Sequence, residues 1–312
     1  DLYGNRESKY AWLKENEFSP FEYNQITPTS PFYFFIPTNV SQIRYYSNWP
    51  RITDIFPENV TGIVTARDNL AINFDKKTLL RNIETFQNKN FTDDFVKEIF
   101  KLSENYAWKI HPQREEFQGV NDIEGYIKEI LYRPFDKRYI FYQPNIVFRM
   151  RTDVMRHMLK ENLGLITSRQ MDKSGIEPVF ITNSMIDAHS ITSATSISYL
   201  FPLYLYPDEE ELNLFNQTEQ KREPNIDQTI LLKLHEVYAQ PFSPELLMQY
   251  IYAVLSSPLY QQSYADFLKF DFPRVPFTAD SALFQQMAAL GKRLVDLHLL
   301  RSPELDQPIA RF

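Results

Sequence analysis

The sequence has 312 residues, of which 43% are hydrophobic, 15% are aromatic and only 7 are glycine, a composition that predicts a well-packed chain and excludes a disordered one. Its 40 acidic and 33 basic residues give a formal charge of −7, which argues against a protein that coats nucleic acid nonspecifically. The lack of cysteine excludes disulfides and thiolate metal sites, and no apolar run approaches 18 residues, so we expect no membrane span and a cytoplasmic location.

The first 50 residues are polar, aromatic and rich in proline. Glu7–Glu15 predicts a short helix, and Pro31–Pro37 (PFYFFIP) predicts a buried strand bounded by prolines. The sequence begins at Asp1 rather than at methionine, and we expect the chain to be a piece of a longer polypeptide.

Two short strands, Gly62–Ala66 and Leu70–Phe74, are predicted on either side of a turn at Arg67-Asp68-Asn69. Arg67 and Asp68 are a candidate pair for reading a base. The alternative is a structural role, in which Asp68 orients Arg67 or caps the turn. Helical spacing then recurs in Lys76–Phe86, Asp93–Tyr106 and Ile123–Leu131. Thr92 is a candidate N-cap for the second of these helices.

An aromatic and basic stretch follows at Tyr132–Tyr142, which reads YRPFDKRYIFY. Side chains alternate in its second half, which predicts a strand, and Gln143-Pro144-Asn145 has the composition of a turn. Alternation resumes in Ile146–Arg151. On a strand, Arg149 and Arg151 would share one face, about 7 Å apart.

A short helix is expected next, with Thr152 or Asp153 as its N-cap and Gly164 at its end. Residues 132–173 contain nine basic and four acidic residues, a local excess of five positive charges in an acidic chain. Such a patch predicts binding of an anion or of nucleic acid. The alternative is a solvated basic hairpin whose cations pair with acidic residues elsewhere on the surface.

Three further apolar or alternating runs are expected to join the same mixed sheet: Leu165–Ser168, Pro178–Thr182 and Tyr199–Leu205. Between them, Asn183–Ser198 is rich in serine and threonine. It is either a loop that hydrogen-bonds base edges or a plain surface loop. Asp208–Asn225 is acidic and polar, and we expect an exposed linker.

The last part of the chain has a helical pattern. Asp227–Tyr238 opens it, Ser243 followed by Pro244 predicts a second helix start, and Thr278 with Asp280 predicts a third. The second and third helices carry long apolar stripes. Helix packing is the ordinary explanation of these stripes, and a groove for a partner is the alternative.

Catalytic motifs are mostly missing. The sequence has no GxG, so it has neither a dinucleotide fingerprint nor a phosphate loop, and the five histidines show no metal-ligand spacing. One formal nuclease pattern occurs, in which Pro207-Asp208 precedes Glu219-Gln220-Lys221. That chemistry needs acids on adjacent buried strands, whereas these acids fall in a hydrophilic linker, so we interpret the match as chance.

Several stretches together resemble one family. They are GIVTARD at Gly62–Asp68, the aromatic stretch Tyr132–Tyr142, the expected Arg149/Arg151 strand with the Val154–Leu159 helix, FPLYLY at Phe201–Tyr206, and His235–Phe277. The combination resembles the C-terminal target-recognition region of type ISP and related type IIG single-chain restriction-modification enzymes.

The resemblance implies a module that chooses the DNA site while other domains do the chemistry. It implies double-stranded DNA and an upstream N6-adenine methyltransferase domain as partners. S-adenosylmethionine, ATP and Mg²⁺ would belong to the parent enzyme, and this chain would hold no cofactor. The Asn/Asp-Pro-Pro-aromatic motif of adenine methyltransferases is missing here, in keeping with a fragment that recognises DNA without methylating it.

The sequence therefore predicts an α+β fold, a mixed β-sheet recognition domain with flanking helices followed by a helical subdomain. We expect a methyltransferase tail over residues 1–60, a recognition core over 61–206, an acidic linker over 207–226 and helices over 227–312. Two alternatives stay open: a metal-dependent nuclease or hydrolase using Asp208, Glu219 and Lys221, and a docking module that does not bind DNA. The candidate DNA-binding residues are Arg67, Arg133, Lys137, Arg138, Arg149, Arg151, Arg156, Lys160 and Arg169, with Tyr132, Asp136, Asp68 and Asn183 supporting them.

Overall fold

The computed structural model describes residues 5–15, 25–28, 30, 33, 40–170, 179–191, 196–208, 222–238 and 241–306. The chain divides into two compact units, residues 1–47 and 48–312, and each is described by itself. The first unit contains helices α1 (Arg6–Glu15) and α2 (Val40–Tyr46), so the helix predicted over Glu7–Glu15 is confirmed. The strand predicted over Pro31–Pro37 lies outside the described residues except for Tyr33, which is exposed and not in a strand.

One sheet of the second unit has the strand order β2-β4-β3-β7. These strands are β2 (Ile72–Asn73), β3 (Ile127–Arg133), β4 (Asp136–Phe141) and β7 (Met185–Ile186). All pairs are antiparallel except β3 with β7, so the sheet is mixed, and the β3–β4 hairpin has an irregularity between Leu131 and Arg133.

The helix predicted over Ile123–Leu131 is wrong. Only a 3₁₀ turn forms there, η2 (Glu124–Tyr126), and the rest is β3. The apolar residues at 123, 127, 130 and 131 match helical spacing, but pairing with β4 on one side and β7 on the other satisfies the backbone as a strand. Tertiary contacts therefore override the local pattern.

A second sheet has the order β1-β8-β5-β6 and is antiparallel throughout its described strands. Its strands are β1 (Val60–Thr61), β8 (Ser198–Pro202), β5 (Gly164–Ser168) and β6 (Phe180–Thr182). The strands expected after residue 164 are thus confirmed as strands, but they do not join the sheet of the basic hairpin. A small ribbon of β9 (Tyr204–Leu205) and β10 (Glu223–Pro224) completes the strands.

The segment after β1 links the two sheets. Ile63 bridges to Asp187 just beyond β7, and Val64 bridges to Arg149 on its other side. Gly62 permits this close approach, because a Cβ there would lie 2.3 Å from the Asp187 carbonyl oxygen. The strand predicted over Ile146–Arg151 is reduced to the single bridge at Arg149, because a turn occupies residues 144–146 and Arg151 adopts a left-handed conformation.

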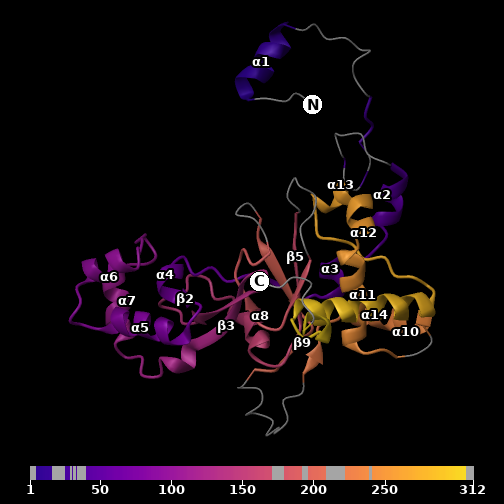
Figure 1. The fold of residues 1–312 in the computed structure, drawn as a ribbon. Helices are drawn as coiled ribbons and strands as arrows, with labels where there is room; N and C mark the ends of the chain where they lie inside the picture. Colours follow the sequence, from indigo (N-terminus) through magenta and orange to yellow (C-terminus); the bar gives the residue numbers. More distant parts are fainter. Residues whose placement is uncertain are drawn as a thin grey trace. The chain divides into compact units, whose positions relative to one another are not determined.

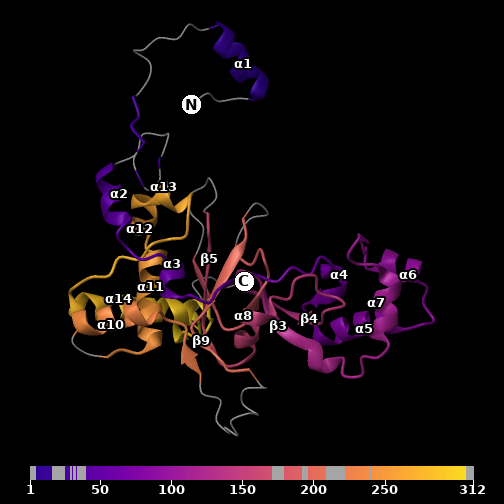
Figure 2. The ribbon, with the colours of Figure 1, turned by 180° about the vertical axis from the view of Figure 1, so that it is seen from behind.

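Helices flank the first sheet: α4 (Asp68–Ala71), α5 (Lys76–Gln87), α6 (Asp93–Ile99) and α7 (Ile110–Phe117). The short helix α3 (Ile52–Ile55) lies beside the C-terminal part instead, where the Ile52 N–H donates to the Pro273 carbonyl. The strand predicted over Leu70–Phe74 is therefore partly α4. The Thr92 cap is confirmed, since its side chain accepts from the Phe95 N–H, but α6 ends well before Tyr106 and Lys101 follows with a φ of 50°. The two views in Figures 1 and 2 agree that α5, α6 and α7 gather beside β2 and β4.

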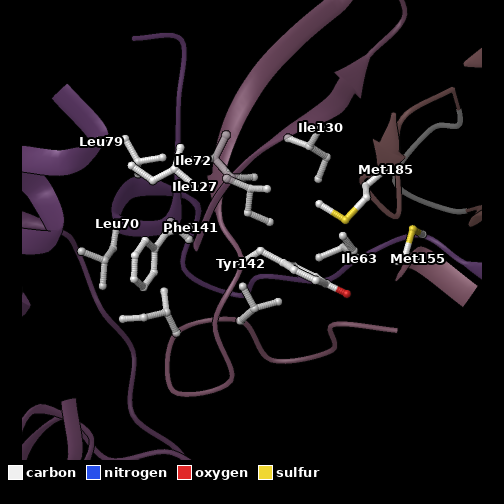
Figure 3. Packing of buried hydrophobic residues seen from close by; sticks show 14 of the residues in the cluster. Ile63, Leu70, Ile72, Leu79, Ile127, Ile130, Phe141, Tyr142, Met155 and Met185 are labelled. Atoms are coloured by element: carbon white, nitrogen blue, oxygen red, sulfur yellow. The ribbon is translucent and has the colours of Figure 1, made fainter. Parts of the chain in front are cut away.

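A continuous apolar core joins these elements. Leu70, Leu79, Ile130, Phe141 and Met185 are fully buried, and Figure 3 shows them packed with Ile63 from the linking segment. The core reaches both sheets, since Ile166 of β5 and Leu200 of β8 belong to it. The surface residues of the basic hairpin therefore stand on a rigid base.

The C-terminal part is helical, as predicted. Its helices are α10 (Gln228–Tyr238), α11 (Pro244–Ser256), α12 (Pro258–Ser263), α13 (Ala265–Leu268) and α14 (Ser281–His298), followed by η4 (Pro303–Asp306). Ser243 and Asp280 cap α11 and α14 through their side chains, as predicted. Helices α11 and α14 pack on each other, and α14 also meets β6. The buried face of α14 consists of Phe284, Ala288, Gly291 and Val295, whereas Leu283 and Leu290 of its predicted apolar stripe are exposed, so packing explains that stripe only in part. The α+β fold class is confirmed.

Candidate nucleic-acid interface

Four side chains form an alternating stack, which we call the cation–π row: Phe74, which directly follows β2, Arg138 on β4, and Tyr132 and Arg133 on β3. The Arg138 guanidinium lies between two rings, 3.9 Å from the centroid of Phe74 and 4.0 Å from that of Tyr132. Arg133 stacks on Tyr132 at 4.0 Å. Pairing of β2 with β4 and of β4 with β3 places these residues in order across the sheet.

Carboxylates fix the cation–π row in place. Asp136 accepts from Arg138 at 2.8 Å, Asp187 accepts from Arg133 at 2.8 Å, and Asp68 accepts from the Tyr132 hydroxyl at 2.8 Å. Asp187 is buried, and burial raises the pKa of its carboxyl above the ordinary value, although Arg133 and the His189 N–H favour the charged form. Arg133 and Arg138 therefore stiffen the surface, because each already has a carboxylate partner.

Asp136 and Asn183, two of the predicted supporting residues, each contact one of the candidate cations. Asp136 orients Arg138, and the amide oxygen of Asn183 accepts from the Lys137 ammonium at 2.6 Å. Lys137 itself has no carboxylate partner among the described residues, so its charge is available to an anion.

Arg149 and Arg151 line a recess of about 510 Å³, which we call the two-arginine recess. Within the described ranges neither residue forms an ion pair. Arg151 precedes α8 (Thr152–Met155) with a φ of 59°, so it occupies the N-cap position expected for Thr152 or Asp153. Its Nε is buried without a hydrogen-bond partner. Glu58 and Asp153 also line the recess, so its charge is mixed.

A second recess of about 480 Å³ shares Glu58 and Asp153 with the first and contains Arg156. Arg156 donates to the Tyr206 carbonyl at 2.9 Å and pairs with Asp208 at 2.8 Å. Lys160 lies 5.2 Å from the Tyr206 ring. The helix expected here continues as η3 (Arg156–Leu159) and ends before Gly164, which instead opens β5.

Two candidates lie apart from these recesses. Arg169 is exposed and lies 3.6 Å from Asp271. Arg67 is only 5% exposed, stacks on Trp108 at 3.8 Å and donates to the Ile146 carbonyl at 2.7 Å. Burial lowers the pKa of the Arg67 guanidinium to about 10. The structural alternative for Arg67 fits this position, whereas contact with a base does not, because the side chain is enclosed. Asp68 serves Thr65 and Tyr132 instead.

The linking segment sets the separation of the two cation groups. From Arg138 on β4, the backbone passes through β3, Asp187 and Val64 to reach Arg149. Four strand spacings of about 4.8 Å amount to ~19 Å along this path. The structure thus separates cations that the sequence places in one patch, but it keeps them on one continuous run of paired backbone.

Sequence reasoning missed Phe74 and Asp187 as members of this site. Phe74 was included only as the end of a predicted strand, and its large exposed fraction was not visible in the pattern. Asp187 lies far from Arg133 in the sequence, and no local signal connects the two. Their roles depend on the strand order, which the sequence did not reveal.

The nuclease alternative gains no support. Asp208 pairs with Arg156, and Glu219 and Lys221 lie outside the described residues. Within the part of the chain that the structure describes, no three His, Asp or Glu residues gather as metal ligands. In the same ranges, every helix is too short or too polar to cross a bilayer.

Comparison with known families identifies the chain. Residues 54–312 match the family described as the Type ISP C-terminal specificity domain, and the chain belongs to this family. None of the curated proteins compared matches it.

Three solved structures share its fold. The DrdV–DNA complex has 21% identity and a TM-score of 0.69 over 94% of this chain and 29% of that chain. The ATP-dependent Type ISP restriction-modification enzyme LlaBIII bound to DNA has 22% identity and a TM-score of 0.66 over 92% and 18% of the two chains. A nuclease-deletion mutant of the Type ISP enzyme LlaGI, in complex with a DNA substrate mimic, has 22% identity and a TM-score of 0.62 over 99% and 23%. This chain thus spans less than a third of each of those proteins.

Proposed function

We propose that this chain is a double-stranded DNA target-recognition module of a restriction-modification enzyme. The observation that carries the proposal is membership of a specificity-domain family, together with cations that lack carboxylate partners beside a rigid sheet. Lys137, Arg149, Arg151 and Lys160 would contact phosphates or guanine edges, because arginine can bind guanine N7 and O6 with two hydrogen bonds. The cation–π row would support the surface between them.

The module would hold its site for an upstream N6-adenine methyltransferase domain of the same cytoplasmic polypeptide. S-adenosylmethionine, ATP and Mg²⁺ would then act in that parent enzyme, and catalysis would not depend on residues of this chain. Arg156 and Arg169 would join the DNA contact only if their ion pairs with Asp208 and Asp271 open.

Charge reversal in the two-arginine recess tests this function. We expect Arg149→Glu with Arg151→Glu to weaken duplex DNA binding at least tenfold at low salt, because two attractive contacts become repulsive. Fluorescence anisotropy with a pool of random duplexes measures the affinity, and circular dichroism checks the fold.

The matched control reverses two exposed lysines of the helical part, Lys233→Glu with Lys292→Glu, which changes the net charge equally. Equal losses in both double variants would contradict a localised DNA site. Unchanged binding in the recess variant would show that the DNA contact lies elsewhere on the chain, and a wild-type chain that binds no duplex would leave only the docking role.

A further inference from the structure

Phe74 stands at the outer end of the cation–π row. Its side chain is 64% exposed, although one ring face carries the Arg138 guanidinium at 3.9 Å. Because most of the side chain remains accessible, the opposite ring face is open to solvent. A large aromatic ring left open on a surface is a natural contact for a flat apolar group.

The orientation of this ring is set before any ligand arrives. Arg138 is fixed by Asp136 on its edge and by Tyr132 on its second face, and Asp68 holds the Tyr132 hydroxyl. Binding to a ring held in this way costs little side-chain entropy, since the neighbouring groups are already ordered.

The charges around Phe74 indicate which part of a nucleic acid would meet it. The two arginines of the row are matched by Asp136 and Asp187, and Asp68 adds a third carboxylate. A phosphate gains little from such a surface, whereas the π face of a base stacks well on an aromatic ring whatever the base.

We propose that Phe74 stacks on a nucleobase of locally opened DNA. This inference rests on the proposed function, because it assumes that the sheet surface meets DNA. Inside an intact duplex both faces of each base are covered by neighbouring bases, so the ring can stack only where the helix is interrupted. Phe74 would thereby favour DNA in which a nucleotide has left the stack.

Binding to two probes tests the proposal. One probe is an intact duplex, and the other has the same flanks with a three-nucleotide single-stranded gap that contains 2-aminopurine. We expect the wild-type chain to bind the gapped probe more tightly and to quench its fluorescence. Phe74→Ala should reduce the ratio of gapped-probe to duplex affinity by about tenfold, and its salt dependence should stay unchanged, because no charge is altered.

Two further variants separate stacking from folding. Phe74→Leu keeps apolar bulk without a π face and should behave as Phe74→Ala, whereas Phe74→Trp should keep the preference. Tyr106→Ala is the matched control, since Tyr106 is a fully exposed aromatic residue on another loop, and it should match the wild type.

The outcomes distinguish the two proposals. The stacking proposal is overturned if Phe74→Ala keeps the preference for the gapped probe, or if it loses affinity equally for both probes. The proposed DNA recognition stands in that case if Arg149→Glu with Arg151→Glu still weakens binding. Stacking is supported if Phe74→Leu loses the preference for the gapped probe and Phe74→Trp keeps it. A wild-type chain that binds neither probe overturns both proposals.

Discussion

Arg133 and Arg138 show how an arginine can serve a surface without remaining free to bind. Each guanidinium has a carboxylate at its edge and an aromatic ring on its face. Lysine could not reproduce this arrangement, because its ammonium is a point charge without a planar face. The charge of each of these two residues is therefore neutralised by a carboxylate of the protein, and the two side chains instead fix the shape and stiffness of the sheet edge.

His157 gives the molecule a pH-dependent stability. Its buried ring accepts a hydrogen bond from the Tyr206 N–H at Nδ1, and burial lowers the pKa of the ring to about 4, with Arg156 and Lys160 acting in the same direction and Asp208 against them. The unfolded chain binds this proton more readily, so stability is complete above pH 6.5 and falls as the pH approaches 4. The loss is up to about 3 kcal/mol.

Urea unfolding at pH 7.5, 6.0 and 5.0 measures this loss. We expect His157→Gln to be less stable at every pH but to lose less stability on acidification, because glutamine does not titrate. If the free energy of unfolding changed equally with pH in the wild type and in His157→Gln, a group other than His157 would cause the loss of stability.

At the level of elements, the contact of α11 with α14 depends on one small residue. A Cβ at Gly291 would lie 1.8 Å from the carbonyl oxygen of Gln249, so the two helices can approach only with glycine there. Gly291→Ala should destabilise the chain by about 1–3 kcal/mol, although alanine favours helices, because the helices must move apart.

Chemical denaturation checks this expectation. Gly119→Ala is the control, since its nearest neighbour would be at an ordinary 3.8 Å, and we expect it to change stability by less than about 1 kcal/mol. A stabilised Gly291→Ala would mean that the helix contact adjusts freely.

Elements with strong local signals could be predicted from the sequence. Ser243, Asp280 and Thr92 mark real helix starts, because an N-cap acts on its own first turn. The strand β3 could not be predicted, since its partners β4 and β7 decide its state and β7 is remote in sequence. The prediction that β5, β6 and β8 join the sheet of the basic hairpin was wrong for the same reason, because remote strands decide which sheet they form.

At the level of the whole molecule, salt dependence reports how many cations meet DNA. Four of the nine candidates lack a carboxylate partner in the described ranges and are not buried: Lys137, Arg149, Arg151 and Lys160. Four phosphate contacts predict a log–log slope of about −4, or roughly a 100-fold loss between 50 and 200 mM salt. Eight contacts, which would add the four ion-paired arginines but not the enclosed Arg67, would give about −7.

Anisotropy titrations over this salt range measure the slope, and Arg149→Gln with Arg151→Gln should reduce its size by about 2. A wild-type slope near −7 would show that the ion pairs at Arg133, Arg138, Arg156 and Arg169 open on binding. A slope unchanged by the double substitution would remove those two arginines from the contact.

The sequence predicted only part of the candidate site, because local patterns locate charged residues but not their tertiary partners. Charge counting along the chain located the basic segment and most of its residues. It could not show that Arg67 is enclosed by Trp108, or that Asp187 and Asp271 neutralise Arg133 and Arg169, because these partners are brought together only by the fold. Local sequence thus located the cations, and tertiary structure determines which remain available.

Residues 62–64 connect the Arg133 and Arg149 regions through main-chain hydrogen bonds, so the backbone and not the side chains sets the distance between these two arginines. Exposed side chains on either flank can then be exchanged during evolution without altering that distance. New target sequences could arise in this framework by surface substitution alone, whereas replacing Gly62 would disturb the spacing on which every such variant depends.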